Sequence, residues 1–279
     1  MALTPPLIIN APEVTPRAHG LFSVVAFPAT PADPHWQGGG ILWQGGACLG
    51  GVRGLGAWDC AVEEGAQPAV GLPKDLDSET SEGSGSPFTL YAPFACSPVG
   101  TGPQDAQDAA SRTLLAGEEA AVENAFWTGY LGNVPNLSGA NGYDAPTDLG
   151  AFDAAHEALA AVEAGLATTI VGRGMIHVPV RLASILLAKG GLRAASGKVT
   201  TDLGTPVVVG AGYPDVMQII GTPEVVGLRS EVFTSSGVSG DLFDRGTNTM
   251  HAIAERSYVL GMADCGLFSA TVTSPEVTP

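Results

Sequence analysis

Two short motifs contain residue types that do chemistry in other proteins. Gly172-Arg173-Gly174 is similar to the start of a dinucleotide-binding turn, but His177 stands where GxGxxG has its third glycine. An acidic residue about 20 positions later, which would bind the ribose, is also absent. His156-Glu157 begins like the zinc motif HExxH, yet Ala160 replaces the second histidine. We therefore predict a turn at a strand–helix junction for the glycines and a surface position for His156.

A third candidate is an acidic segment that could gather around a calcium ion. Its side chains are Asp75, Asp77, Glu79 and Glu82. They lack the glycine and the distal glutamate that complete an EF-hand loop. The sequence thus predicts no catalytic, cofactor-binding or metal-binding residue.

The cysteines do not suggest metal chemistry either. Cys48, Cys60, Cys96 and Cys265 show neither a CxxC pair nor another metal-ligand spacing. Because residues 1–19 have no basic region and no apolar core, we expect no signal peptide and reduced, partly buried thiols. In the absence of secretion, the Asn136-Leu137-Ser138 triplet is interpreted as a chance match to the glycosylation sequence.

Two blocks of opposite charge suggest contacts between chains. Five basic residues and no acid lie between Ala164 and Thr201, whereas six acids and one base lie between Glu63 and Glu82. In a chain with only 14% charged residues, such blocks favour docking between copies, and two unrelated solvated faces are the alternative. The candidate contact residues are Asp75, Asp77, Glu79, Glu82, Arg173, Arg181, Lys189, Arg193 and Lys198.

The composition excludes several classes of protein. The 279 residues carry a net charge of −16, which repels phosphate backbones and anionic membranes. No apolar run reaches the ~18 residues of a membrane-spanning helix. The apolar fraction of 45% predicts a globular chain, while 38 glycines and 21 prolines indicate many turns and extended segments.

The helices and strands that position the candidate residues are predicted to form an α+β fold. The clearest helix is 104–127, an alanine-rich stretch that ends at Gly129 and has Leu115, Val122 and Phe126 on one stripe. Further helices are expected at about 151–165 and 179–189. Strands are expected at 21–27, 88–92, 168–171, 207–209, 218–220, 224–226, 257–260 and 267–272.

We predict two extended segments in the N-terminal third of the chain. Residues 1–38 contain seven prolines and predict an arm that lies on another surface. Residues 55–92 predict a long hairpin with a hydrophilic tip at 73–87. We expect neither segment to bury its apolar residues within its own subunit, so both need neighbouring copies.

Taken in order, these segments resemble a tailed-bacteriophage major capsid protein of the Hong Kong ninety-seven type, and those of actinobacterial phages in particular. The resemblance is carried by Phe88-Thr89-Leu90-Tyr91 before the long helix, the helix ending 118–129, the segment 197–213, and Phe243-Asp244-Arg245-Gly246-Thr247-Asn248. It implies the following organisation: N-terminal arm 1–38, peripheral-domain strand region 39–54, extended loop 55–92, peripheral domain 93–148 with spine helix 104–127, axial domain 149–248, and a return to the peripheral domain at 249–279.

The resemblance also implies a function. Members of this family are non-enzymatic shell proteins that assemble into hexamers and pentamers of an icosahedral head around double-stranded DNA. It implies a virion protein assembled in the host cytoplasm, with no cofactor, no membrane and only non-specific contact with DNA. Separate scaffold, portal and decoration proteins are the expected partners. Three alternatives stay open: an encapsulin-like compartment of the same fold, a soluble α/β enzyme that uses the Gly172–Gly174 turn, and another virion component such as a tail or decoration protein.

Overall fold

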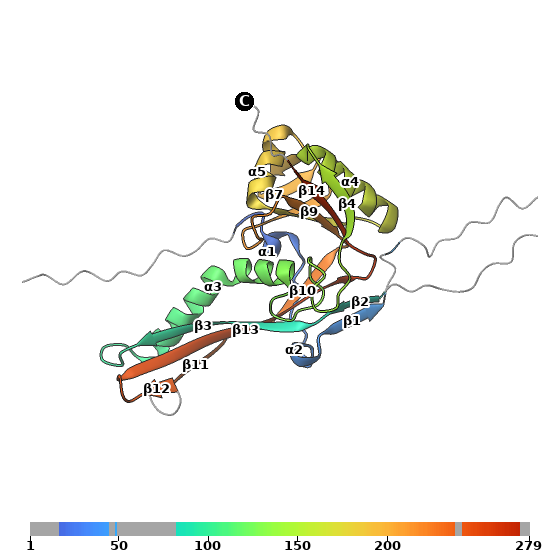
Figure 1. Cartoon of the computed structure of the whole chain (residues 1–279). Helices are drawn as coiled ribbons and strands as arrows, with labels where there is room; N and C mark the ends of the chain where they lie inside the picture. Colours follow the sequence, from blue (N-terminus) through green and yellow to red (C-terminus); the bar gives the residue numbers. More distant parts are fainter. Residues whose placement is uncertain (1–16, 45–47, 49–81, 238–241, 274–279) are drawn as a thin grey trace, which may run out of the picture.

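A computed structural model describes residues 17–44, 48, 82–237 and 242–273, and Figure 1 shows their arrangement. The fold is α+β, as predicted, with two mixed layers of sheet and helix. Residues 1–16 of the expected arm and residues 49–81, which include most of the expected hairpin, lie outside the described residues. The hairpin tip predicted at 73–87 is wrong at its end, because residues 82–85 form a strand. In the described part of the chain no helix is long and apolar enough to cross a membrane.

The first sheet is built on one long strand, β13 (Thr249–Ala263). Its antiparallel neighbours are β2 (Glu82–Gly85), β3 (Pro87–Cys96), β10 (Val225–Arg229), β11 (Phe233–Gly237) and β12 (Phe243–Asp244). The remaining strand, β1 (Ile41–Gln44), pairs with β2. The strands predicted at 88–92, 224–226 and 257–260 therefore all belong to this sheet.

The long helix α3 (Pro103–Thr128) lies on one face of this sheet (Figure 1), which confirms the helix predicted at 104–127. It begins where the backbone N–H of Gly102 donates to the Asp105 carboxylate, 3.0 Å away. It ends at Gly129, whose φ of 69° is a left-handed conformation that favours glycine. The predicted apolar stripe is wrong at Leu115, which is 50% exposed, because Leu114 turns inward instead.

The second sheet carries the two shorter helices, α4 (Ala155–Thr169) and α5 (Val180–Lys189). The strand order is β4 (Thr147–Phe152), β14 (Phe268–Val272), β9 (Gln218–Thr222), β5 (Met175–Pro179), β8 (Pro206–Gly210), β7 (Lys198–Thr201) and β6 (Leu192–Ala195). The helix predicted at 179–189 and the strands at 207–209, 218–220 and 267–272 are confirmed.

Two predictions in this region are wrong. The helix expected at 151–165 begins later, at Ala155, because residues up to Phe152 pair in parallel with β14. No strand forms at 168–171 because α4 continues through Thr169. Ile170 makes only an isolated bridge, to Cys48.

The described half of the expected arm also differs from the prediction. Residues 21–27 begin with a short helix, α1 (Leu21–Val24), and contribute only an isolated bridge between Ala26 and Val226. A second short helix, α2 (Trp36–Gly39), follows. Leu21, Val25 and Trp36 are buried within this same chain. The expectation that the arm needs a neighbour to cover its apolar residues is therefore wrong for residues 17–38.

A disulfide joins Cys48 to Cys265, 217 residues apart, which corrects the expectation of reduced thiols for these two residues. Cys265 lies between β13 and β14, directly after Asp264, whose N–H donates to the Glu82 carbonyl at 2.8 Å. Cys96 has a free thiol, while Cys60 lies outside the described residues. The covalent bond thus fixes the chain just before residues 49–81 to the connection between the two sheets.

Candidate functional site

The five predicted basic contact residues gather on and beside the second sheet. Arg173 lies in the turn between α4 and β5, Arg181 and Lys189 lie near the two ends of α5, and all three are exposed. Arg193 and Lys198 lie on β6 and β7, where Arg193 pairs with Thr200 and Lys198 with Ala195. Because opposed residues share a face of a sheet, these two side chains lie on the same side of the hairpin.

Two of the five bases are neutralised within the chain. Arg193 Nε lies 2.5 Å from Asp202 Oδ1, and Arg181 Nη1 lies 3.8 Å from Asp215 Oδ2. Asp202 directly follows the acid-free stretch and Asp215 lies further along the chain, so folding reduces the positive charge that the sequence suggested. Within the described residues, Arg173, Lys189 and Lys198 form no ion pair.

The acidic half of the predicted contact is mostly outside the described part of the chain. Asp75, Asp77 and Glu79 lie in the segment 49–81. Glu82 is the first residue of β2, in the first sheet, whereas the five basic residues belong to the second sheet. The pairing of the two blocks therefore stays a prediction.

The glycine turn at Gly172–Gly174 has no helix N-terminus after it. It joins the end of α4 to β5, so it is a helix–strand junction and not the strand–helix junction expected from the sequence. Gly172 has a φ of +93°, and a Cβ on Gly174 would meet the Thr222 carbonyl oxygen at 2.8 Å. These glycines are explained by the tight turn, and a phosphate-binding cradle at a helix N-terminus is not formed here.

His177, which follows this turn, is buried completely on β5. Its Nδ1 lies 2.8 Å from Tyr213 Oη and its Nε2 lies 3.1 Å from Thr222 Oγ1. Thr222 Oγ1 already donates to the Pro223 carbonyl, so it accepts from His177 Nε2–H. Nδ1 therefore accepts from the Tyr213 hydroxyl. Burial lowers the pKa of His177 to about 3, so the ring is neutral near pH 7.

Two glutamates on α3 bind the start of α1, and one of them also binds the loop that follows β8 of the second sheet. Glu123 is 1% exposed, and its Oε1 and Oε2 accept from the N–H groups of Leu21 at 2.9 Å and Gly212 at 2.8 Å. One turn earlier, Glu119 Oε1 accepts from the Phe22 N–H at 3.0 Å. These carboxylates replace the side-chain cap that α1 lacks at Gly20. Burial raises the pKa of Glu123, against the hydrogen bonds that lower it.

A third glutamate, Glu118, ties α3 to the long strand. Its Oε2 lies 3.0 Å from Arg256 Nη1 on β13, and both side chains are nearly buried. Tyr258 Oη donates to the same carboxylate, and Arg256 Nε donates to the Ser230 carbonyl at 2.7 Å. Burial, reinforced by the Glu118 charge, raises the pKa of Tyr258. This network is satisfied internally and leaves no group poised to react.

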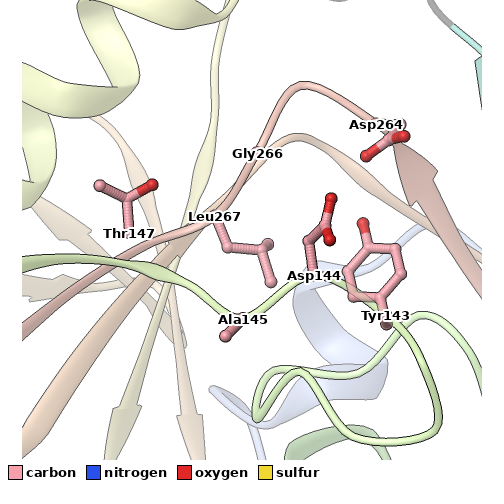
Figure 2. Close-up of a pocket in the computed structure, with 7 residues that line it drawn as sticks. All are labelled: Tyr143, Asp144, Ala145, Thr147, Asp264, Gly266 and Leu267. Atoms are coloured by element: carbon pink, nitrogen blue, oxygen red, sulfur yellow. The ribbon is translucent and has the colours of Figure 1, made fainter.

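A pocket of about 320 Å³ lies where β4 meets the connection between β13 and β14 (Figure 2). Tyr143, Asp144 and Asp264 line it together with Leu267. Burial, followed by the charges of Asp264 and Asp144, raises the pKa of Tyr143 to about 12. Among the residues that the structure describes, neither this pocket nor any other place brings together three histidine, cysteine or acidic side chains that could hold a metal ion.

Sequence reasoning missed Glu118, Glu123 and His177, although one signal was present. Glu118, Val122 and Ala125 follow the spacing of the buried face of α3, so an acid stood on the predicted apolar side. An acid at such a position indicates a buried partner, here Arg256.

Asn136, whose glycosylation triplet was interpreted as a chance match, is completely buried and is inaccessible to a glycan.

Comparison with solved structures shows which proteins share this fold. The capsid of the native GTA particle matches with a TM-score of 0.57 at 12% identity, over 98% of this chain and 96% of that chain. A chain of Mycobacterium phage Ogopogo matches with a TM-score of 0.54 at 10% identity, over 97% of both chains. The holo-SrpI encapsulin complex from Synechococcus elongatus gives a TM-score of 0.53 at 11% identity, over 98% of this chain and 93% of that chain.

At the level of sequence, no protein-family model matches the chain, and no curated protein matches it. The likeness therefore concerns the fold, and it extends over nearly the whole chain. The expected fold of tailed-phage capsid proteins, shared with encapsulins, is confirmed.

Proposed function

We propose that this chain is the major capsid protein of a tailed-phage-like particle, a non-enzymatic subunit that assembles with copies of itself into a closed shell. The observation that carries the proposal is the agreement of its fold, over almost its full length, with the capsid chain of the GTA particle. A match that includes both sheets and the long helix α3 is stronger support for a shared function than a match to one common motif.

The finer features of the proposal follow the fold family. Copies form hexamers and pentamers of an icosahedral head, which encloses double-stranded DNA in the virion. The net charge of −16 suits a container whose wall does not bind the packaged DNA tightly. Scaffold, portal and decoration functions fall to separate chains, and assembly takes place in the host cytoplasm.

Contacts between subunits are proposed to include the two charge blocks. Arg173, Lys189 and Lys198 are exposed and unpaired among the described residues, so they are free to meet the acidic segment of a neighbour. Changing Asp75, Asp77 and Glu79 to lysine is expected to weaken assembly, most strongly at low salt. Assembly that is unchanged at every salt concentration would contradict this pairing.

An encapsulin-like compartment is the second candidate, and a specific observation favours it. The encapsulin complex matches this fold with a TM-score of 0.53, close to the values of the phage structures. Such a compartment would enclose a cargo protein instead of a genome.

The enzyme alternative has lost its main support, because the Gly172 turn precedes a strand and not a helix.

The test is sedimentation velocity of the purified chain, with negative-stain imaging of the fast fraction. We expect capsomers, sheets or closed shells. A 28.2 kDa monomer at every concentration and salt condition would contradict unaided self-assembly, but not a capsid subunit that assembles on a separate scaffold protein. Analysis of particles from the native source then separates the two candidates, because DNA inside supports the capsid and a cargo protein supports the compartment.

A further inference from the structure

One face of the first sheet is open along β11, β13 and β3. On the inner face of these strands Leu90, Ala92 and Ala254 belong to the buried core beneath α3. On the outer face Trp36 of α2 covers Val259. Beyond that point the outward side chains of β13, from Ser257 to His251, remain partly exposed. Figure 1 shows this half of the sheet extending away from the rest of the molecule.

The strand register places two aromatic rings on either side of a carboxylate on this open face. Phe233 of β11 pairs with Glu255 of β13, and Glu255 pairs with Tyr91 of β3. Opposed residues share a face, and neighbouring strands lie about 5 Å apart, so the three side chains form one row. Tyr91 is 67% exposed and Phe233 is 65% exposed. We call these three residues the aromatic–acid row.

The row has the chemistry of a cation-binding surface. Glu255 forms no hydrogen bond or ion pair with its side chain among the described residues. A guanidinium or ammonium group above it would meet the carboxylate directly and the faces or edges of two rings at its sides. Ile253 and Pro93, paired in the next outward row, supply an apolar border. A long basic side chain, with an aliphatic stem and a charged end, fits this combination.

We propose that the aromatic–acid row binds an arginine or lysine side chain of a second copy of this chain. The proposal rests on the proposed function, because a shell brings copies into contact. It is favoured by charge: subunits with a net charge of −16 repel one another, so a contact forms best where a base of one copy meets an acid of the next. Arg173, Lys189 and Lys198 are exposed bases without an ion-pair partner among the described residues.

The experiment measures assembly of Tyr91→Ser and Glu255→Gln by sedimentation velocity across protein and salt concentrations. Each change is expected to raise the protein concentration needed for particle formation about tenfold. Tyr91→Ser removes one of the two aromatic rings, and Glu255→Gln removes the negative charge. The effect of Glu255→Gln should shrink at about 1 M salt, whereas that of Tyr91→Ser should persist. Leu203→Ser and Glu224→Gln, at an 82% exposed leucine and an exposed acid outside this row, are the matched controls.

Nitration by tetranitromethane, read by mass spectrometry, gives a second readout that does not depend on a variant. Tyr91 is expected to react in dissociated subunits and to be protected in particles. Particles in which Tyr91 stays reactive, or that form equally well from the row variants, would overturn this inference and leave the proposed function standing. A wild-type chain that never associates, either alone or with a scaffold protein, would contradict the proposed function and remove the inference with it.

Discussion

Arg256 Nη1 on β13 lies 3.0 Å from Glu118 Oε2 on α3, and this ion pair is almost completely shielded from water. The pair connects the middle of the longest helix to the longest strand. A buried charge that loses its partner destabilises a fold far more than the intact pair stabilises it. The contact is therefore a sensitive point for the packing of α3 on the first sheet.

Changing Glu118 to leucine is expected to lower the free energy of unfolding by about 3–5 kcal/mol. The change leaves Arg256 buried without its counter-ion and Tyr258 without its acceptor. Adding Arg256→Met should recover most of the loss, because no unpaired charge remains. Urea denaturation of dissociated subunits measures both effects, and a double variant less stable than the single one would contradict this account.

Changing Glu123 to glutamine is expected to cost about 1–3 kcal/mol, because both carboxylate oxygens accept from backbone N–H groups and an amide keeps only one acceptor. Hydrogen exchange should accelerate at Leu21 or Gly212. Glu119→Gln is the matched control: Glu119 accepts from one N–H, that of Phe22, and the amide oxygen still serves it. Equal losses in the two variants would show that the bond to Gly212 contributes little.

His177 is expected to make stability depend on pH. The unfolded imidazole has a pKa near 6.5, and burial lowers the folded pKa to about 3. The unfolded state thus binds the proton first, so the stability present above pH 6.5 is lost as pH falls toward 3. By pH 5 this loss reaches about 2 kcal/mol. His177→Gln should be less stable at pH 7 and should show a shallower pH dependence.

The control for this measurement is His156→Gln, since His156 is exposed on α4. That variant should keep the pH dependence of the wild type. The unfolding free energies are compared at pH 7 and pH 5, where the acidic residues contribute similarly to all three proteins. A His177→Gln variant with the wild-type pH dependence would argue against a buried neutral imidazole.

The Cys48–Cys265 disulfide is expected to stabilise the oxidised subunit by about 2–4 kcal/mol, because it closes a long loop in the unfolded chain. Cys265→Ser should show this loss, and a reducing agent should destabilise the wild type but not the variant. Cys96→Ser is the control, since that thiol is free. Alkylation of the denatured, unreduced protein should label Cys96 and spare Cys265; labelling of Cys265 would exclude the bond.

The elements best predicted from the sequence are those whose periodicity and end signals agree. Helix α3 has alanine-rich turns, an acid in its first turn and a glycine after its last residue, and its predicted bounds are correct to within one residue. The strand predicted at 168–171 is wrong because local β-branched residues, Thr168 to Val171, were outweighed by continuation of the amphipathic helix. The helix at 21–24 was missed because glutamates about a hundred residues away cap it.

The candidate site was harder to predict than the fold. The five basic residues are exposed, but the sequence did not show that two of them, Arg193 and Arg181, form ion pairs with acids of the same chain. The disulfide joins residues 217 positions apart, and no spacing rule connects such a pair. The aromatic–acid row depends on the register of three strands, which is set by tertiary packing and not by any one of the segments.

The core beneath α3 extends into the second sheet. Met175, Val208 and Ile220, from β5, β8 and β9, belong to the same buried cluster as Phe126 of α3 and Met250 of β13. Neither sheet can lose its structure without exposing part of the other's apolar surface. Heating a dissociated subunit should therefore produce a single calorimetric transition, with equal calorimetric and van 't Hoff enthalpies, as for one cooperative folding unit.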